Sequence, residues 1–428
     1  MKLTVRNVAR ISLADIELDG ITVISGSNGT GKSTISRSLM TLASVSKNIS
    51  ELVQVERINS VFHYLRKSFA KHGADIFYPP HFLRDSKNDW AKWLSKDWWA
   101  ESERSVSWIR RDNRILVYPE NFSDSDNLIS VIDDARTDIF SVLDRPESEY
   151  VDFICRKSLS KSFNGQVRPE FSNTPVESEI KLENSGSDIS FNFRDGELSA
   201  FNGIGRSFNP STIYIEPLNF VDFVNSPEKG IQDRYTARQF CVCRAISRKP
   251  TDTGLSIEEA GELNEAKKIV ERIVRIIRGS LVDDNKDVRF NEKFSNDKTK
   301  PIDVLNIASG MKTMASIVRM VENRSIRRGS MLIVDEPETN LHPDWQVKFA
   351  LFLVLLSRDL GVKLLTNTHS PYFLQAIWKY TGKLGVNGKF YNMIQGDSPD
   401  SYATKDISSN INCVFEAMSK PFNDLMGD

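Results

Sequence analysis

The sequence has few cysteines, and they form no recognisable framework. Its 428 residues include four: Cys155, Cys241, Cys243 and Cys413. No two of them form a Cys-x-x-Cys pair, and none lies at ligand spacing from a histidine. Cys241 and Cys243 could share a metal ion, but isolated thiols in so long a chain are more often structural. The pattern therefore indicates a reduced, cytoplasmic protein.

Long apolar runs and a strong net charge are also missing. No stretch approaches the ~18 uninterrupted apolar residues of a membrane-spanning helix, and the N-terminus lacks the apolar core of a signal peptide. We therefore expect no secretion and no membrane partner. Lysine and arginine number 56 against 57 aspartates and glutamates, a formal net charge of −1. Nucleic acid stays open as a partner, but only a local basic patch could bind it.

A complete phosphate-loop motif is present near the N-terminus. Residues 26–33 read Gly-Ser-Asn-Gly-Thr-Gly-Lys-Ser, between an apolar run and a helical pattern. The glycines let backbone N–H groups and a helix N-terminus face phosphate oxygens. Lys32 is expected to reach the β- and γ-phosphates, and Ser33 to ligate Mg²⁺. The predicted ATP-binding residues here are Gly26, Ser27, Asn28, Gly29, Thr30, Gly31, Lys32, Ser33 and Thr34.

Two carboxylates end a second apolar strand, in the segment LIVDEPE at 332–338. Asp335 is placed to hold Mg²⁺, directly or through a water molecule. Glu336 follows it and is the natural general base to activate the attacking water. Two adjacent carboxylates after a buried strand are otherwise hard to explain without a cation. The pair therefore predicts ATP hydrolysis.

His369 and the pair Ser309-Gly310 complete the set. His369 follows another apolar strand, in VKLLTNTHS at 362–370, and is the expected sensor of the γ-phosphate. Ser309-Gly310 opens a helix with periodic apolar residues, and a helix N-terminus is an anion site. Only the length of one helix and one strand separates Ser309-Gly310 from Asp335. In a fold of the usual size, the pair therefore cannot reach the phosphate that Lys32 of the same chain holds. A second copy of the protein could supply it.

These motifs, in this order, resemble those of the ABC-type ATPases. More narrowly, the chain resembles the branch that contains SMC proteins, recombination ATPases and OLD-type proteins. The segments ASGMK, DEPETNLHPDWQ and THSPYFLQAI are similar to stand-alone AAA-family ATPases of antiphage systems such as Septu, PARIS and retrons. The resemblance implies a head-to-tail, ATP-dependent homodimer, with higher oligomers left open. It places Asn340 in a loop that communicates across the dimer, and Arg6 and Asn7 near the base.

The fold class expected is α/β: an ABC-type P-loop ATPase with a mixed sheet, an antiparallel β subdomain and large helical insertions. Alternating apolar residues at 179–201 predict an antiparallel meander, 256–280 an amphipathic helix, and 283–301 a polar loop. The domains expected are a first ATPase lobe at 1–40 and 176–225, a helical, tryptophan-rich insertion at 41–175, a helical arm at 226–300 and a second lobe at 301–428.

Several departures from the family pattern argue against particular functions of its members: a transporter subunit, a protein with a long coiled-coil arm and a nuclease. ASGMK stands where transporter subunits carry LSGGQ, and the helix at 256–280 is far shorter than a coiled-coil arm. The chain after His369 is too short for the nuclease domain that OLD-type proteins append. Glu216 holds the position where relatives place a glutamine that senses the Mg²⁺-bound water.

Five of the seven tryptophans lie between Trp90 and Trp108, among lysines and arginines. Three interpretations remain open: a surface for a partner or a second copy, the core of the insertion, or a stacking platform for single-stranded nucleic acid.

Two functions from different classes follow. The first is an ATPase whose dimerisation around ATP and Mg²⁺ controls a separately encoded effector, a nuclease or toxin, in antiphage defence. The alternative is a DNA-binding genome-maintenance ATPase of the SMC type, which a basic groove across the dimer would favour.

Overall fold

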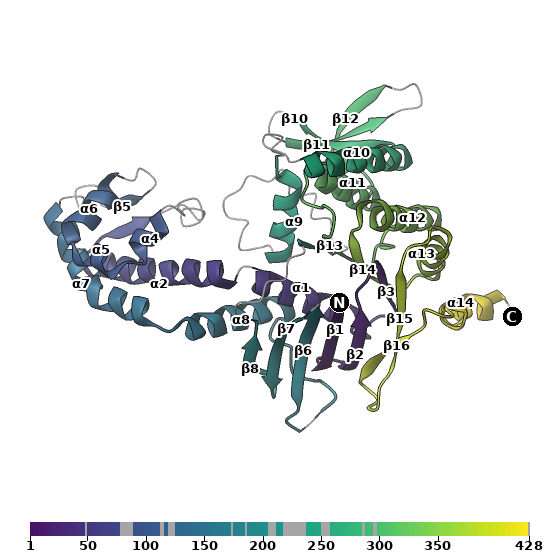
Figure 1. Cartoon of the computed structure of the whole chain (residues 1–428), viewed down its shortest axis with the longest axis horizontal. Helices are drawn as coiled ribbons and strands as arrows, with labels where there is room; N and C mark the ends of the chain where they lie inside the picture. The colour runs from purple at the N-terminus through teal and green to yellow at the C-terminus, as the bar shows by residue number, and fades with distance from the viewer. Residues whose placement is uncertain are drawn as a thin grey trace. The chain divides into compact units, whose positions relative to one another are not determined.

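The computed structural model describes residues 1–47, 49–77, 89–111, 115–118, 125–172, 174–184, 186–203, 211–216, 237–249, 257–284, 287–293 and 298–426. It contains two compact units. Unit 1 comprises Met1–Lys47 and Leu159–Asp428, and unit 2 comprises Asn48–Ser158. Both are drawn in Figure 1, and each is described here by itself.

An eleven-stranded sheet is the frame of unit 1, with the order β8-β7-β6-β1-β2-β16-β15-β3-β14-β13-β9 in the described part of the chain. Its strands are β1 (Lys2–Val8), β2 (Ile11–Glu17), β3 (Ile21–Ser25), β6 (Glu177–Asn184), β7 (Ser187–Arg194), β8 (Glu197–Asn202), β9 (Thr212–Ile215), β13 (Met331–Asp335), β14 (Lys363–Thr368), β15 (Gly388–Gln395) and β16 (Tyr402–Asp406).

The sheet has a parallel half and an antiparallel half. Strands β15, β3, β14, β13 and β9 run parallel. Strands β2, β1, β6, β7 and β8 run antiparallel, and the last three form the predicted meander. The expected α/β class with a mixed sheet and an antiparallel subdomain is confirmed.

Helices cover both faces of the parallel half, so β3 and β13 are buried along their whole length. On one face, α1 (Lys32–Lys47) packs across β9, β13 and β14. Alternate strand residues such as Leu332 and Val334 belong instead to a core with α10 (Ile257–Ile277), α11 (Ser309–Glu322), α12 (Pro343–Leu360) and α13 (Pro371–Lys383). Figure 1 shows the last three beside β13, β14 and β15. Because both faces are covered, these strands read as continuous apolar runs.

One sequence expectation was wrong. The stretch 283–301, predicted as a polar loop, contributes to a three-stranded antiparallel sheet of β10 (Gly279–Asp284), β11 (Asp287–Lys293) and β12 (Thr299–Asp303). Only one face of this sheet is buried, by Leu281, Val288 and Phe290, so most of its residues are polar. The helix predicted at 256–280 is α10, which begins at Ile257 and ends at Ile277.

The remaining elements of unit 1 are α9 (Ala237–Ser247), a short 3-10 turn at Val304–Asn306, and α14 (Asn412–Met426). No helix in the described ranges has the length and apolar character needed to cross a membrane. Burial raises the pKa of the Cys155 thiol to about 12 and that of Cys243 to about 11. Both thiols therefore stay protonated at neutral pH and are poor metal ligands or nucleophiles.

Unit 2 is mostly helical. It contains α2 (Ile49–Lys71), β4 (Asp75–Phe77), α4 (Trp90–Trp93), α5 (Lys96–Ala100), α6 (Ser102–Arg111), β5 (Leu116–Tyr118), α7 (Ser125–Asp144) and most of α8 (Glu147–Phe163). Strands β4 and β5 pair antiparallel, and α2 packs along α7.

Tryptophans form the core of unit 2. Trp93 and Trp99 are fully buried, and Trp90 and Trp98 are 7% exposed. The Trp98 and Trp99 rings meet edge to face at 4.6 Å, and the Trp99 indole N–H donates to the Trp93 carbonyl at 2.9 Å. Of the three interpretations, the core of the insertion is confirmed for these four. A partner surface and a stacking platform are wrong for them, because their rings are covered within the unit.

Trp99→Ala is expected to lower the free energy of unfolding of unit 2 by about 3–5 kcal/mol, since it empties a packed site. Urea unfolding followed by near-UV circular dichroism measures it. Phe153→Ala is the control, because that ring is 50% exposed and should cost far less. Nucleotide binding by unit 1 should persist in both. A Trp99→Ala protein of wild-type stability would contradict the assignment.

Candidate functional site

Three strand ends meet at one edge of the sheet. In the parallel register Ser25 lies opposite Thr368, and Asn367 lies opposite Asp335. The residues that follow are the phosphate loop after β3, Glu336 after β13 and His369 after β14. The fold thus brings together motifs that are more than 300 residues apart in the sequence.

The phosphate loop has a backbone that glycine alone adopts readily. Gly26 has φ +149° and Gly31 φ +91°. A Cβ on Gly31 would lie 2.5 Å from Cδ1 of Ile11, and one on Gly26 would lie 2.8 Å from Cβ of Met393. The loop therefore packs against β2 and β15 on one side, and its N–H groups are left for phosphate oxygens.

Lys32 begins α1 beneath this loop. Its Nζ donates to the carbonyls of Gly26 and Ser27, both at 2.8 Å, and the side chain is buried. Burial lowers the pKa of Lys32, and the negative charges of Glu336, Asp335 and Glu338 oppose that shift. The Lys32 ammonium therefore lies among three carboxylates. The oxygens of a bound phosphate would replace the two carbonyls as acceptors of its hydrogen bonds.

Asp335 is held rigidly by two neighbours that the sequence reasoning missed. Tyr214 donates its hydroxyl to Oδ2 at 2.9 Å, and Asn367 donates its amide to Oδ1 at 2.7 Å. The same amide reaches Ser36 Oγ on α1 at 2.8 Å. Burial and the charge of Asp335 raise the pKa of Tyr214 well above its usual value, so the phenol stays a donor. Neither Tyr214 nor Asn367 belongs to a recognisable sequence motif, because both stand within apolar strand segments.

The donor set fits Mg²⁺. This cation prefers oxygen ligands and is commonly bound by one or two carboxylates, waters and substrate phosphates. Ser33 and Asp335 supply the hydroxyl and the carboxylate, and each Asp335 oxygen keeps a lone pair beyond its hydrogen bond. No cluster of three metal-ligating side chains occurs among the residues described, so a site here depends on the phosphates.

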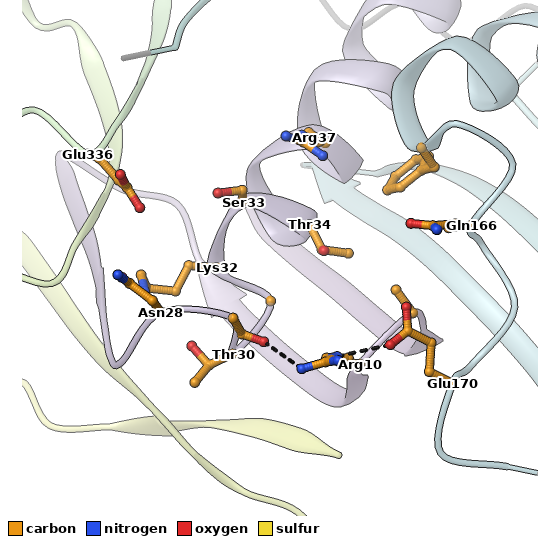
Figure 2. Close-up of a pocket in the computed structure, with 14 residues that line it drawn as sticks. Arg10, Asn28, Thr30, Lys32, Ser33, Thr34, Arg37, Gln166, Glu170 and Glu336 are labelled. Atoms are coloured by element: carbon orange, nitrogen blue, oxygen red, sulfur yellow. Dashed lines mark hydrogen bonds and ion pairs between the residues drawn. The ribbon is translucent and has the colours of Figure 1, made fainter. Parts of the chain in front are cut away.

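Glu336 faces a cavity of about 260 Å³ beside the phosphate loop. Its backbone has φ +46°, unusual for a side chain other than glycine or asparagine, and its N–H donates to the Asn367 carbonyl at 3.0 Å. Thr339 Oγ donates to its Oε2 at 3.4 Å. Figure 2 shows the carboxylate above Asn28 and Lys32, beside Ser33. A base in this position can reach a water at the end of a bound phosphate chain.

Glu338 is the functional residue that sequence reasoning missed most clearly. It is 4% exposed, and its Oε1 accepts hydrogen bonds from Thr368 Oγ at 2.8 Å and the His369 N–H at 2.6 Å. A third comes from the Ser370 N–H at 3.2 Å. Burial raises the pKa of Glu338, although these donors favour its ionised form. The only sign of Glu338 in the sequence is that it is a third carboxylate in the segment DEPE, and an exposed turn would contain such carboxylates as well.

Glu338 holds the backbone N–H of His369 and lies beside its side chain, whose Nδ1 has no hydrogen-bond partner in the described residues. His369 Nδ1 lies 3.3 Å from Glu338 Oε1 and 3.7 Å from Glu336 Oε1. The His369 side chain is 38% exposed, so it can still face a ligand. The predicted sensor and the predicted base are therefore neighbours, joined by a buried carboxylate.

Gly310 and Asn340 are not among the residues that line the cavity. Ser309 begins α11, as predicted. A Cβ on Gly310 would lie 1.8 Å from Cδ2 of Leu341, so the glycine is required for α11 to pack against the loop that follows Glu338. Asn340 in that loop has φ +60°. Within one copy, these residues form a connected element away from the phosphate loop.

The other end of the cavity is lined by Ala9, Arg10, Phe163, Gln166 and Glu170, with Arg37 from α1. Arg10 Nε lies 2.9 Å from Glu170 Oε2, and its Nη1 donates to the Gly29 carbonyl at 3.5 Å, as Figure 2 shows.

Arg6 and Asn7 are not among the residues that line the cavity, and their expected place near the base stays a prediction. Arg6 lies in β1 opposite Leu13 and Glu179, and Asn7 donates to the Glu177 carbonyl. The turn at Ala9 and Arg10 reaches the cavity instead. Glu216 follows β9, the strand that pairs with β13, but does not line the cavity.

Comparison with known families matches residues 21–375 to the family described as "AAA domain, putative AbiEii toxin, Type IV TA system". This match confirms the predicted resemblance to AAA/ABC-type ATPases, while the resemblance to antiphage ATPases stays a prediction. No curated protein matches the sequence.

Solved structures similar to the chain include three SMC heads. The SMC head domain from Thermotoga maritima is 9% identical, with 95% of this chain and 98% of that chain covered and a TM-score of 0.36. An SMC head bound to the C-winged helix domain of ScpA is 9% identical, with coverage of 95% and 97% and a TM-score of 0.44. An SMC head with an extended coiled coil, bound to the C-terminal domain of ScpA derived from Pyrococcus furiosus, is 10% identical, with coverage of 98% and 98% and a TM-score of 0.35.

Glu338→Ala is expected to lower kcat for ATP hydrolysis about 100-fold with little change in KM, because a misplaced catalytic group costs about that much. Glu338→Gln keeps an acceptor oxygen for the His369 N–H and should recover part of the loss. Steady-state ATPase kinetics measure both.

Asp344→Ala, which removes an exposed carboxylate of α12 paired with Lys348, is the control and should behave as wild type. Equal kinetics for Glu338→Ala and wild type would show that this carboxylate does not position His369.

Proposed function

Since the chain belongs to the AAA-domain family whose model matches residues 21–375, we propose that it binds and hydrolyses ATP between two copies of itself. We propose further that this cycle controls a separately encoded effector, a nuclease or toxin, in antiphage defence. The observation that carries the proposal is the convergence of Lys32, three carboxylates and His369 at one edge of the sheet.

Each residue has one task in hydrolysis. Lys32 and the loop N–H groups bind the phosphates, and Ser33 and Asp335 hold Mg²⁺. When bound, Mg²⁺ neutralises charge on the phosphate oxygens. Glu336 takes a proton from the attacking water. His369, positioned by Glu338, donates a hydrogen bond to the γ-phosphate.

A second copy completes the site. Gly310 and Asn340 do not line the cavity of their own chain, and α11, which Ser309 begins, offers its N-terminus as an anion site. In a head-to-tail dimer, this end of each copy closes on the ATP held by the other. Because the arrangement is symmetric, two ATP molecules would be bound.

Unit 2 supports control of an effector. Its chain connections to unit 1 both involve helices that reach the nucleotide cavity: α1 begins at Lys32, and α8 ends at Phe163. A change of nucleotide can therefore act on unit 2 through rigid helices.

Glu336→Gln is expected to trap an ATP-bound dimer, because it keeps the shape of the base and removes its proton acceptance. Light scattering coupled to gel filtration, with and without ATP, measures the mass. Lys32→Ala is the control, and it should bind no nucleotide and remain monomeric. Unchanged turnover in Glu336→Gln would remove the base from the mechanism, and a monomer with bound ATP would remove the dimer.

The effector is tested by purifying tagged Glu336→Gln protein with ATP, after expression with its native gene neighbours. Mass spectrometry identifies what is bound. A protein that the Glu336→Gln chain binds in a stoichiometric amount, and that the Lys32→Ala chain does not retain, supports control of an effector. A bare dimer that carries nucleic acid supports instead the alternative, a genome-maintenance ATPase of the SMC type.

A further inference from the structure

A second polar pocket lies at the opposite end of the strands from the nucleotide cavity. Its volume is about 700 Å³, within the range of small-molecule sites. It is lined by Lys47, Ser211, Thr212, Ile213, Tyr214, Val242, Arg244, Ala245, Ser247, Arg248 and Ser325. We call it the cationic pocket. Thr212 begins β9, and Lys47 is the last residue of α1. Helix α1 therefore extends from the phosphate loop to the cationic pocket, over about 24 Å.

The charged residues that line the cationic pocket are all basic. Lys47, Arg244 and Arg248 are exposed, and no aspartate or glutamate is among its described lining residues. Arg327 adds a fourth positive charge, because it acts electrostatically on Lys47. Partial burial and the Arg327 charge both lower the pKa of Lys47. The charges of Lys47 and Arg327 therefore repel one another, and an anion beside them would relieve that repulsion.

Most neighbouring cations of the protein behave differently. Arg328, the residue after Arg327, lies 3.2 Å from Glu265, and Arg319 lies close to Asp283. Within the described residues, no ion pair involves Lys47, Arg244, Arg248 or Arg327. In a chain of net charge −1, such a group of cations without carboxylates is a local exception and favours an anionic ligand.

Helix capping accounts for only part of this group. Lys47 ends α1, and Arg244 lies in the last turn of α9, where a cation complements the helix dipole. The carbonyl of Ala245 at the end of α9 already accepts from Asn323 and Ser325, and that of Ile246 accepts from Asn323. Arg248 follows α9 and Arg327 lies outside both helices, so neither belongs to the last turn of α1 or α9.

We propose that the cationic pocket binds phosphate groups, held by Lys47, Arg244 and Arg248 with Ser247 as an additional donor. Arginine and lysine together with hydroxyl groups are the usual ligands of phosphate in proteins. The phosphates come either from the phosphodiester backbone of a nucleic acid or from a small phosphorylated molecule. The site is separate from the phosphate loop, and its ligand is bound without being hydrolysed there.

The test uses the full chain and the double substitution Arg244→Gln with Arg248→Gln, at two exposed positions. Arg328→Gln is the matched control, an exposed and ion-paired arginine. The first probe is a fluorescent 12-nucleotide single strand, titrated by anisotropy at several salt concentrations. The second is inorganic pyrophosphate, titrated by calorimetry in the Lys32→Ala background so that the phosphate loop does not contribute.

Strand binding that weakens about 10-fold or more in the double variant, with a salt slope reduced by about 1.4 for two lost contacts, identifies nucleic acid as the source. Stoichiometric pyrophosphate binding that the double variant loses, without strand binding, identifies a small phosphorylated molecule. The control should bind either probe as wild type does. If neither probe binds, or the double variant binds as tightly as wild type, the cationic pocket is only a solvated surface.

Discussion

The parallel register of β3, β14 and β13 is the constraint on which the site depends. It sets Ser25 beside Thr368 and Asn367 beside Asp335, so the residues that follow these strands emerge at one edge. A slip of one residue would turn the side chains of a strand to the opposite face. Burial on both faces by α1 and by α11, α12 and α13 prevents such a slip, because every position along β13 is buried.

Within that frame, a small polar network gives each catalytic group a single position. Asn367 links Asp335 to α1 through Ser36, and Glu338 links β13 to the start of α13 through Thr368 and Ser370. The network is only partly satisfied, because Glu338 Oε2, Asn367 Oδ1 and His369 Nδ1 have no hydrogen-bond partner in the described residues. Three donors compensate for the solvent that Glu338 Oε1 has lost, and burial still raises the pKa of this carboxyl.

Helix α1 gives the protein its longest direct connection from the site. Its N-terminus carries Lys32 among phosphate-binding N–H groups, its C-terminus carries Lys47 in the cationic pocket, and the chain then continues into unit 2. One helix of 16 residues thus has Lys32 at its first position and Lys47 at its last.

The sequence by itself determined the phosphate loop, the carboxylates of β13 and the meander at 179–201, because each depends on local spacing and alternation. It could not determine the roles of Glu338, Tyr214, Asn367 or Arg10, since each acts through a partner distant in the chain. The tryptophans show the same limit: their clustering was visible, but only packing decided that they are core. The strands within 283–301 were missed because one buried face leaves few apolar residues. Local patterns specify chemistry, and tertiary packing decides which side chains meet.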